Sequence, residues 1–221
     1  MIEPDRIIRS ARRSLSVSVD AFGKVTVRAP KNCSSERIYA FLQDKEGWIL
    51  KHKQKRDGAA ALLPTENLDG FTFLILGEEH RVSLCDGKRI SYDKSTRVIS
   101  VPNDAPEGKI RGWLKENAKR IFKARTLEWA EKMGLTVSSV SVTSAKKRWG
   151  SCSYNKGAIR YTYRLLYAPK ECVDYVIVHE LCHLKEHGHD ARFWAYVERT
   201  LPDYKRRDKW LKDHAYLLHI F

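Results

Sequence analysis

The segment HELCH, at positions 179–183, combines residue types and a spacing that suit a catalytic metal ion. Four residues advance an α-helix by about 400°, so His179 and His183 project from nearly the same face, one turn apart. Neutral imidazoles suit Zn²⁺, and a catalytic zinc takes three protein ligands and leaves a fourth position for water. Zinc lowers the pKa of that water, and Glu180 is placed to act as the general base of a hydrolase.

The sequence around this motif is apolar. The apolar residues are Cys172, Val173, Val176, Ile177, Val178, Leu181, Cys182 and Leu184. A helix with these residues on most faces is expected to be buried, where two imidazoles and a carboxylate without partners would cost free energy. A bound cation removes that cost. The alternative is a buried His and Glu that ordinary hydrogen bonds satisfy.

The third ligand has three candidates. On an unbroken helix His187 would lie about 12 Å along the axis from His179, too far to share one ion. Gly188 allows the helix to end in a left-handed conformation and the next residue to fold back. We therefore predict His189 as the third ligand and His187 as a surface or neighbouring residue. Glu198, on a later helix, is the competitor, since some zinc sites take a carboxylate.

Hydrophobic periodicity outlines the elements that carry these residues. A β-hairpin with Gly23 in its turn is predicted over 15–27, followed by a helix with Ile38, Phe41, Leu42, Trp48 and Ile49 on its apolar stripe. A loop is expected at 57–70, and two more hairpins at 71–84 and 89–102. One long helix should run from Pro106 to a stop at Gly134.

Beyond this helix the sequence predicts a strand at 137–142, a turn-rich segment at 146–157, and a strand from Ala158 to Leu165. Pro169 should open the helix that carries the motif. Helices follow at 191–199, with Asp190 as its cap, and at 204–218. The predicted fold class is α+β, with a β-rich N-terminal domain at 1–105 and a mostly helical catalytic domain at 106–221.

The composition indicates which partners and which cellular compartment to expect. The 221 residues carry a net charge of +14, and 23 basic against 13 acidic side chains follow position 105. Such an excess favours polyanionic partners, although a solvated surface explains it equally well. Five cysteines without a CxxC pair indicate a reducing cytoplasm. No signal peptide is evident and no apolar run approaches the ~18 residues that cross a bilayer, so no membrane partner is expected.

Four segments in order, RWGSCS (148–153), DYVIVHELCHL (174–184), HGHDARFW (187–194) and LPDYKRRDKWL (201–211), resemble the YgjP-like metal-dependent hydrolase family. VTVRAP (25–30) extends the likeness to the N-terminal part. The resemblance implies a zincin-like fold related to SprT-like proteases, in which the counterparts of His179, His183 and His189 bind the metal and that of Glu180 is catalytic.

The leading hypothesis is a zinc-dependent metallopeptidase that cleaves peptides or proteins. One alternative is a metal-dependent nucleotide phosphohydrolase, with Lys146, Lys147 and Arg148 neutralising phosphate. Another is a DNA-associated basic module with SprT-like protease activity, which binds nucleic acid through a cluster on the last helix. That cluster consists of Lys205, Arg206, Arg207, Lys209 and Lys212, and its alternative is a solvated outer face.

Three smaller questions concern substrate binding. In RWGSC, Arg148 and Trp149 either form a recognition surface or Trp149 packs in the core, with Gly150 required by the backbone. The strand from Ala158 to Leu165 is the candidate to pair with an extended substrate. An oxyanion-stabilising group is also needed. The eligible residues, among which spacing does not choose, are Tyr161, Tyr163, Tyr204 and His214.

Overall fold

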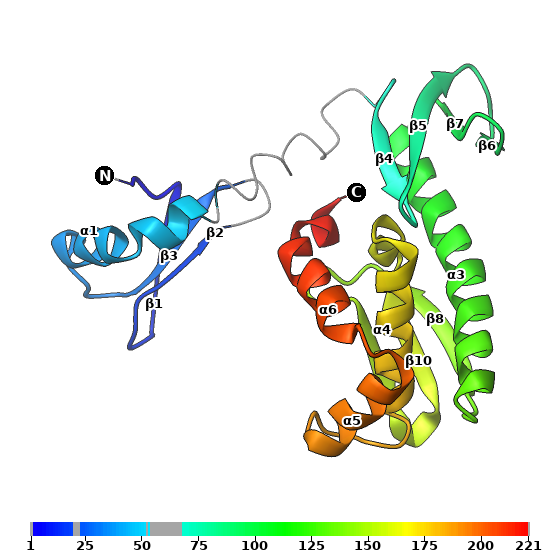
Figure 1. Cartoon of the computed structure of the whole chain (residues 1–221). Helices are drawn as coiled ribbons and strands as arrows, with labels where there is room; N and C mark the ends of the chain where they lie inside the picture. Colours follow the sequence, from blue (N-terminus) through cyan, green and yellow to red (C-terminus); the bar gives the residue numbers. More distant parts are fainter. Residues whose placement is uncertain (1, 20–22, 52, 54–67, 221) are drawn as a thin grey trace. The chain divides into compact units, whose positions relative to one another are not determined.

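The computed structural model of the chain describes residues 2–19, 23–51, 53 and 68–220. The chain divides into two compact units, Met1–Leu63 and Pro64–Phe221 (Figure 1). The domain boundary predicted between residues 105 and 106 therefore lies inside the second unit. Helices and strands occur in both units, which is the mixed α+β composition that the sequence predicts. Strands continue beyond residue 106, however, so the C-terminal part is less purely helical than expected.

The first unit is a three-stranded sheet with a helix. Its strands are β1 (Arg6–Ser10), β2 (Ser16–Val19) and β3 (Val25–Pro30), in the order β1-β3-β2. The pairing of β2 with β3 is antiparallel, which confirms the first predicted hairpin, although residues 20–22 lie outside the described part. Helix α1 (Ser35–Asp44) begins after Ser34, whose hydroxyl accepts a hydrogen bond from the Arg37 amide. Ile38, Leu42 and Ile49 are buried against the valines of β3, whereas Trp48 is exposed.

The second unit begins with a four-stranded sheet. Its strands are β4 (Thr72–Ile75), β5 (Glu78–Cys85), β6 (Ser91–Asp93) and β7 (Val98–Pro102), in the order β4-β5-β7-β6. Both predicted hairpins are confirmed, and a parallel pairing of β5 with β7 joins them. Of the loop predicted at 57–70, residues 57–67 lie outside the described part.

This sheet belongs with the C-terminal half because it contacts it directly. The Leu76 amide donates a hydrogen bond to the Leu166 carbonyl at 2.7 Å, and the Phe73 ring meets Tyr167 edge-on at 5.9 Å between centroids. Helix α3 (Pro106–Lys132) then runs through the unit, as predicted, and ends before Gly134, whose φ is +62°. The predicted junction is thus a packed transition from β7 into α3.

A second sheet lies within residues 139–162. Its strands are β8 (Ser139–Thr143), β9 (Gly150–Ser153) and β10 (Ala158–Thr162), in the order β8-β10-β9. Strand β9 was not expected, because GSCS has no β-branched or aromatic residue and reads as a turn. β10 ends three residues earlier than predicted, and a buried 3₁₀ helix, Tyr163–Tyr167, follows it.

The remaining helices are α4 (Lys170–Cys182), α5 (Ala191–Thr200) and α6 (Tyr204–Asp213), followed by a 3₁₀ helix, Ala215–His219. Helix α4 is the centre of the unit and contacts α3, α5, α6 and β9 (Figure 1). Arg125 of α3 donates hydrogen bonds from Nε and Nη2 to the two carboxylate oxygens of Asp174 on α4, each at 2.6 Å. Within the described residues no helix has both the length and the apolarity to cross a membrane.

Candidate metal centre

Helix α4 places the first two histidines together. Pro169 precedes its first turn, as predicted, and His179 lies in its last turn. His183 is the residue after Cys182, at the C-terminal end, and still has a helical backbone conformation. The ring centroids of His179 and His183 are therefore only 5.0 Å apart.

The chain then reverses and returns His189 to the same place. Its Nε2 lies 3.1 Å from Nε2 of His179, and its ring centroid lies 4.7 Å from that of His183. The prediction that Gly188 makes this reversal in a left-handed conformation is wrong, because its φ is not positive. The Cys182 carbonyl instead accepts hydrogen bonds from the amides of Lys185 and Glu186, and this tightens the turn directly after the helix.

Asp190 holds the other end of the reversal. Its carboxylate accepts hydrogen bonds from the amides of Arg192 and Phe193, each at 3.1 Å, and so caps α5 as predicted. Because His189 directly precedes this cap, the start of α5 fixes the backbone that carries its ring. The third imidazole is therefore positioned by a helix start and the first two by a helix end.

The three imidazoles form a set that fits a divalent metal ion. One ring nitrogen from each of His179, His183 and His189 lies within 4.8 Å of the others. Tetrahedral zinc with ligands at 2.0–2.1 Å requires nitrogens about 3.3 Å apart, close to the 3.1 Å between His179 and His189. Nδ1 of His183 lies 3.1 Å from the Glu186 carbonyl, which leaves its Nε2 as the nitrogen for a metal.

The protonation of this set also suits a metal. Burial, together with the charges of the two neighbouring histidines, lowers the pKa of His179 to about 3. Burial likewise lowers the pKa of His183. Both rings are therefore neutral at physiological pH, which is the form that ligates metal. Nδ1 of His179 is moreover buried without a hydrogen-bond partner among the described residues.

Phe193 packs against all three histidines. Its ring centroid lies 4.9 Å from His179, 4.5 Å from His183 and 4.7 Å from His189. Trp194 covers the outer side, 5.8 Å from His189, and stacks on Tyr204 of α6 at 5.4 Å. The sequence placed both aromatic residues on the capped helix but did not indicate that they form an apolar wall around the cluster.

The two competing ligands lie outside the cluster. His187 is exposed and stacks on Tyr154 with 3.7 Å between ring centroids, in agreement with its prediction as a surface residue. The Glu198 carboxylate is 56% exposed and lies 3.8 Å from Nζ of Lys205. It forms an ion pair on the helix surface instead of contributing to the cluster.

Glu180 lies next to the cluster and is buried, with 6% of its surface exposed. Burial raises the pKa of its carboxyl to about 8, against the opposing charge of Arg148. Its side chain approaches the first residue of β9 so closely that a Cβ on Gly150 would lie 2.6 Å from Oε1. Gly150 is therefore required by the contact with Glu180, and a larger residue would collide with the carboxylate.

A cleft of about 300 Å³ opens beside His179 and Glu180. Its lining residues are Arg148, Trp149, Gly150, Tyr175, Val176, His179, Glu180, Asp208, Leu211 and Lys212. Arg148 and Trp149 thus face the cleft, which favours the recognition-surface explanation of RWGSC over a core role for Trp149.

The residues eligible for oxyanion stabilisation are mostly engaged elsewhere. Tyr161 is fully buried, and its hydroxyl accepts a hydrogen bond from Thr126. Tyr163 is fully buried as well, and His214 stacks on Trp210 at 3.9 Å. The tyrosine that lines the cleft is Tyr175, whose hydroxyl donates to Asp208 at 3.3 Å. Its position four residues before His179, on the same helix face, was the available signal.

The strand proposed to pair with substrate is not available for it. β10 is the central strand of its sheet, parallel to β8 on one side and antiparallel to β9 on the other, so its backbone groups are already used. The edge strand on the side of the cleft is β9.

The basic cluster on α6 is paired with acidic side chains. Nη2 of Arg206 and Nε of Arg207 each lie 2.8 Å from a carboxylate oxygen of Asp203, and Nζ of Lys209 lies 2.8 Å from Asp213. Lys212 pairs with Asp208, and Lys205 with Glu198. Four of the five side chains are at least 74% exposed and Arg207 is 15% exposed, so the cluster is an ion-paired surface.

The five cysteines are free thiols, as the sequence predicts. Burial raises the pKa of Cys152 and of Cys172 to about 11 and that of Cys182 to about 12. At neutral pH all three thiols therefore stay protonated and are poor nucleophiles and metal ligands.

Comparison with known proteins gives one extensive match. A model of the YgjP-like family, described as a metallopeptidase domain, matches residues 13–214. No curated protein matches the chain. The match to the family model spans every residue of the candidate metal centre.

Several solved structures are similar to parts of the chain. One is the metallopeptidase zymogen abylysin of Pyrococcus abyssi, with 24% identity and a TM-score of 0.38 over 41% of this chain and 92% of that one. Another is Wss1 from Saccharomyces cerevisiae, with 15% identity and a TM-score of 0.35 over 42% of this chain and 79% of that one. A Wss1 mutant has 12% identity and a TM-score of 0.35 over 59% of this chain and 93% of that one.

Proposed function

The chain belongs to the YgjP-like metallopeptidase family, and from this premise we propose that it is a zinc-dependent peptidase with Glu180 as its general base. The observation that carries the proposal is the cluster of three imidazoles beside one buried carboxylate. His179, His183 and His189 would hold the ion. Zinc would supply a Lewis acid that activates water and polarises the scissile carbonyl.

Glu180 would move the proton. Its pKa is raised to about 8 by burial, so at neutral pH its protonated and ionised forms lie close in free energy. A carboxylate so balanced accepts a proton from the attacking water and returns it to the leaving amine. The contact with Gly150 limits the orientations that the side chain can adopt. This restriction keeps the base beside the histidines, where the reaction takes place.

The peptide would bind along β9. This edge strand has β10 on one side and, within the described residues, no strand on the other. An extended substrate can therefore add to the sheet through backbone hydrogen bonds and pass beside Gly150 and Glu180. Tyr175 lies in the same cleft, but its hydroxyl proton is donated to Asp208, so it would have to leave that carboxylate before it could donate to a developing oxyanion.

The metal content of the full-length protein tests the site before any substrate is known. We expect wild-type protein purified without chelator to hold about one zinc per chain, measured by inductively coupled plasma mass spectrometry, and His189→Ala to lose most of it. His187→Ala is the matched control, because this ring stacks on Tyr154 outside the cluster. Equal zinc in wild type and His189→Ala would contradict the assignment.

The reaction class is tested on the zinc-loaded protein in two parallel incubations. One contains a mixture of unfolded proteins and peptides, and the other contains nucleoside triphosphates. We expect new peptide termini in the first and no phosphate release in the second. Phosphate release without peptide cleavage would replace the peptidase by the nucleotide phosphohydrolase that remains its rival.

A further inference from the structure

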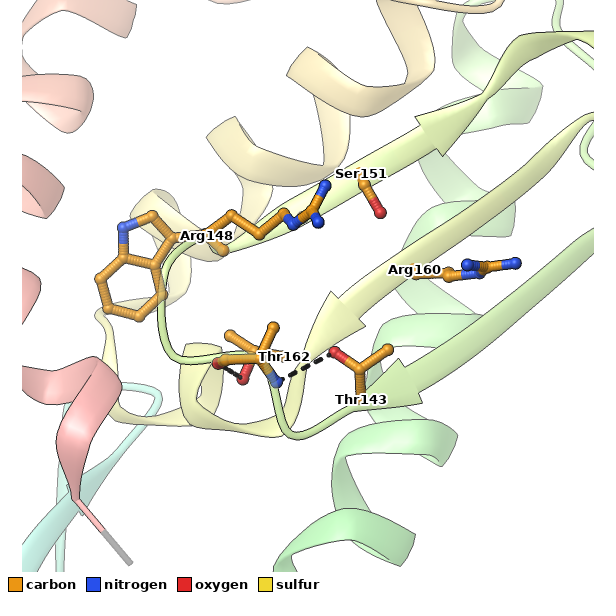
Figure 2. Close-up of a pocket in the computed structure, with 8 residues that line it drawn as sticks. Thr143, Arg148, Ser151, Arg160 and Thr162 are labelled. Atoms are coloured by element: carbon orange, nitrogen blue, oxygen red, sulfur yellow. Dashed lines mark hydrogen bonds between the residues drawn. The ribbon is translucent and has the colours of Figure 1, made fainter. Parts of the chain in front are cut away.

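A second cavity, of about 160 Å³, lies beside the RWGSC segment (Figure 2). Its lining residues are Thr143, Ala145, Arg148, Trp149, Gly150, Ser151, Arg160 and Thr162. Three of these, Arg148, Trp149 and Gly150, also line the cleft beside Glu180. The two cavities therefore adjoin, with the start of β9 between them.

Sheet geometry places the second cavity on the outer face of the sheet. Ser151 pairs with Arg160 across β9 and β10, and Gly150 pairs with Tyr161. Tyr161 is fully buried on the side of α3, where its ring meets Phe122, and neighbouring side chains on a strand point to opposite faces. Ser151 and Arg160 therefore point outward, and Figure 2 shows them on one face of the sheet with the helices behind it.

The chemistry of this cavity is that of an anion site. Two guanidinium groups, of Arg148 and Arg160, line it together with three hydroxyl groups, and no carboxylate does. Within the described residues neither arginine has an ion pair, in contrast to the paired cations of α6. Their donors are thus available to a ligand.

The hydroxyl groups divide into two kinds. Thr162 Oγ1 donates a hydrogen bond to the Ala145 carbonyl at 2.8 Å, and the Ala145 amide donates one to Thr143 Oγ1 at 3.3 Å (Figure 2). Both threonine hydroxyl groups are therefore used in fixing the backbone at one side of the cavity. The Ser151 hydroxyl has no hydrogen-bond partner within the described part of the chain. It is the free hydroxyl donor, placed across the strand pair from Arg160.

An extended peptide on the free edge of β9 would reach both cavities. Its side chains alternate between the two faces of the extended sheet, so the residue that faces Glu180 is followed by one that faces outward. We propose that the outer cavity is a specificity subsite, in which Arg148, Arg160 and Ser151 bind the carboxylate of a substrate Asp or Glu within two residues of the cleaved bond. This proposal rests on the proposed peptidase function and names its substrate class.

The size of the cavity favours a single side chain over a larger polyanion. A volume of about 160 Å³ is enough for one carboxylate side chain, which the donors that line the cavity would surround. The segment 148–150 is shared by both cavities, so an occupied outer cavity also positions the backbone that passes Glu180. A substrate carboxylate should therefore raise the rate of cleavage as well as binding.

The test is a cleavage profile of the zinc-loaded full-length protein on a peptide library, with cut sites read by mass spectrometry. We expect Asp and Glu to be enriched at one position. In a matched pair of peptides, Glu at that position should raise kcat/KM about tenfold or more over Gln, as a charge-assisted hydrogen bond does. Arg160→Glu should abolish this preference, and Arg160→Lys should retain part of it.

The control is Lys156→Glu, an exposed cation in the turn that follows β9 and outside the cavity, which should leave the preference intact. Thermal melting of each variant shows whether it is folded, and the Gln peptide should be cleaved equally by wild type and Lys156→Glu. Peptide cleavage without an acidic preference, or a preference unchanged in Arg160→Glu, would overturn the subsite and leave the peptidase function standing.

Two other outcomes would overturn the subsite for different reasons. Inhibition by inorganic phosphate without any Glu preference would assign the cavity to a free anion. Absence of all peptide cleavage by folded, zinc-loaded protein would remove the peptidase function, and the subsite with it. The library profile therefore distinguishes failure of the subsite from failure of the function on which it rests.

Discussion

Gly150 and Glu180 meet without space between them: a Cβ at position 150 would lie 2.6 Å from Oε1 and 2.8 Å from Cγ of Glu180. The two residues come from β9 and α4, thirty positions apart in the chain. Real Cβ atoms do not approach other atoms this closely, so the carboxylate can hold its present position only because residue 150 has no side chain. The sheet thus sets the orientation of the proposed base.

Gly150→Ala should therefore lower peptidase activity without removing zinc. The added methyl group displaces the Glu180 carboxylate, and a displacement of about 1 Å costs roughly a hundredfold in rate. kcat/KM and zinc content measure the two effects separately. Gly108→Ala is the control, because beyond its chain neighbours and its own helix backbone an added Cβ would meet nothing within 4 Å. Unchanged kcat/KM in Gly150→Ala would show that the base tolerates displacement.

Glu180→Gln should retain the fold and the zinc but lose turnover by about a hundredfold to ten-thousandfold, the usual contribution of general acid–base catalysis. The amide has nearly the shape of the carboxylate but accepts no proton at neutral pH. Initial rates on one peptide, with zinc content and thermal melting as controls, measure the effect. Wild-type rates in a zinc-loaded variant would exclude Glu180 as the general base.

Asp174→Ala should destabilise the second unit by about 3 kcal/mol, because it leaves the guanidinium of Arg125 without its partner. The two side chains are only 17% and 12% exposed, and their pairing joins α3 to α4. Urea denaturation measures the change in unfolding free energy. Glu107→Ala removes an exposed ion pair with Arg111 and should cost at most about 1 kcal/mol. Equal losses of unfolding free energy in the two variants would show that the buried pair contributes no more than the exposed one.

The Asp203 carboxylate should make stability depend on acid pH. The guanidinium groups of Arg207 and Arg206 lower its pKa from 3.8 to about 2. A lowered pKa in the folded state stabilises the protein fully above about pH 4, and this stabilisation is lost as the pH falls toward 2. Asp203→Asn should thus lower the melting temperature at pH 7 by about 1–4 °C, since Asp203 itself is 37% exposed and solvent weakens its ion pairs.

The difference in melting temperature between wild type and Asp203→Asn should shrink as the pH falls from 4 toward 2. Glu116→Gln, at an exposed position on α3, is the control for loss of one negative charge. A difference that stays constant over this range would show that the arginines do not act through the ionised carboxylate.

Much of the local structure could be predicted because it follows from short-range patterns. The hairpins at 71–84 and 89–102, helix α3 with its stop at Gly134, and the cap at Asp190 each depend on residues within a few positions of one another. The i,i+4 spacing of His179 and His183 belongs to this class, since helix geometry alone sets it.

The parts that could not be predicted depend on contacts between distant segments. Strand β9 has no β propensity of its own and exists because β10 pairs with it. For the same reason the prediction that β10 pairs with substrate was wrong, because the residues of a strand do not determine its place in the order of the sheet. The approach of Phe193 to all three imidazoles likewise requires α5 to pack on α4.

The surroundings of α4 have a consequence for how the protein would respond to losing the proposed zinc ion. A zinc finger unfolds when stripped because the ion replaces the core that it lacks. Here the helix with the first two histidines is already enclosed by three helices and a strand, and Val173, Ile177 and Leu181 are fully shielded from solvent. Apolar packing thus sets the positions of the ligands. A chelator should yield an inactive apoprotein that remains folded and binds zinc again when the ion is added.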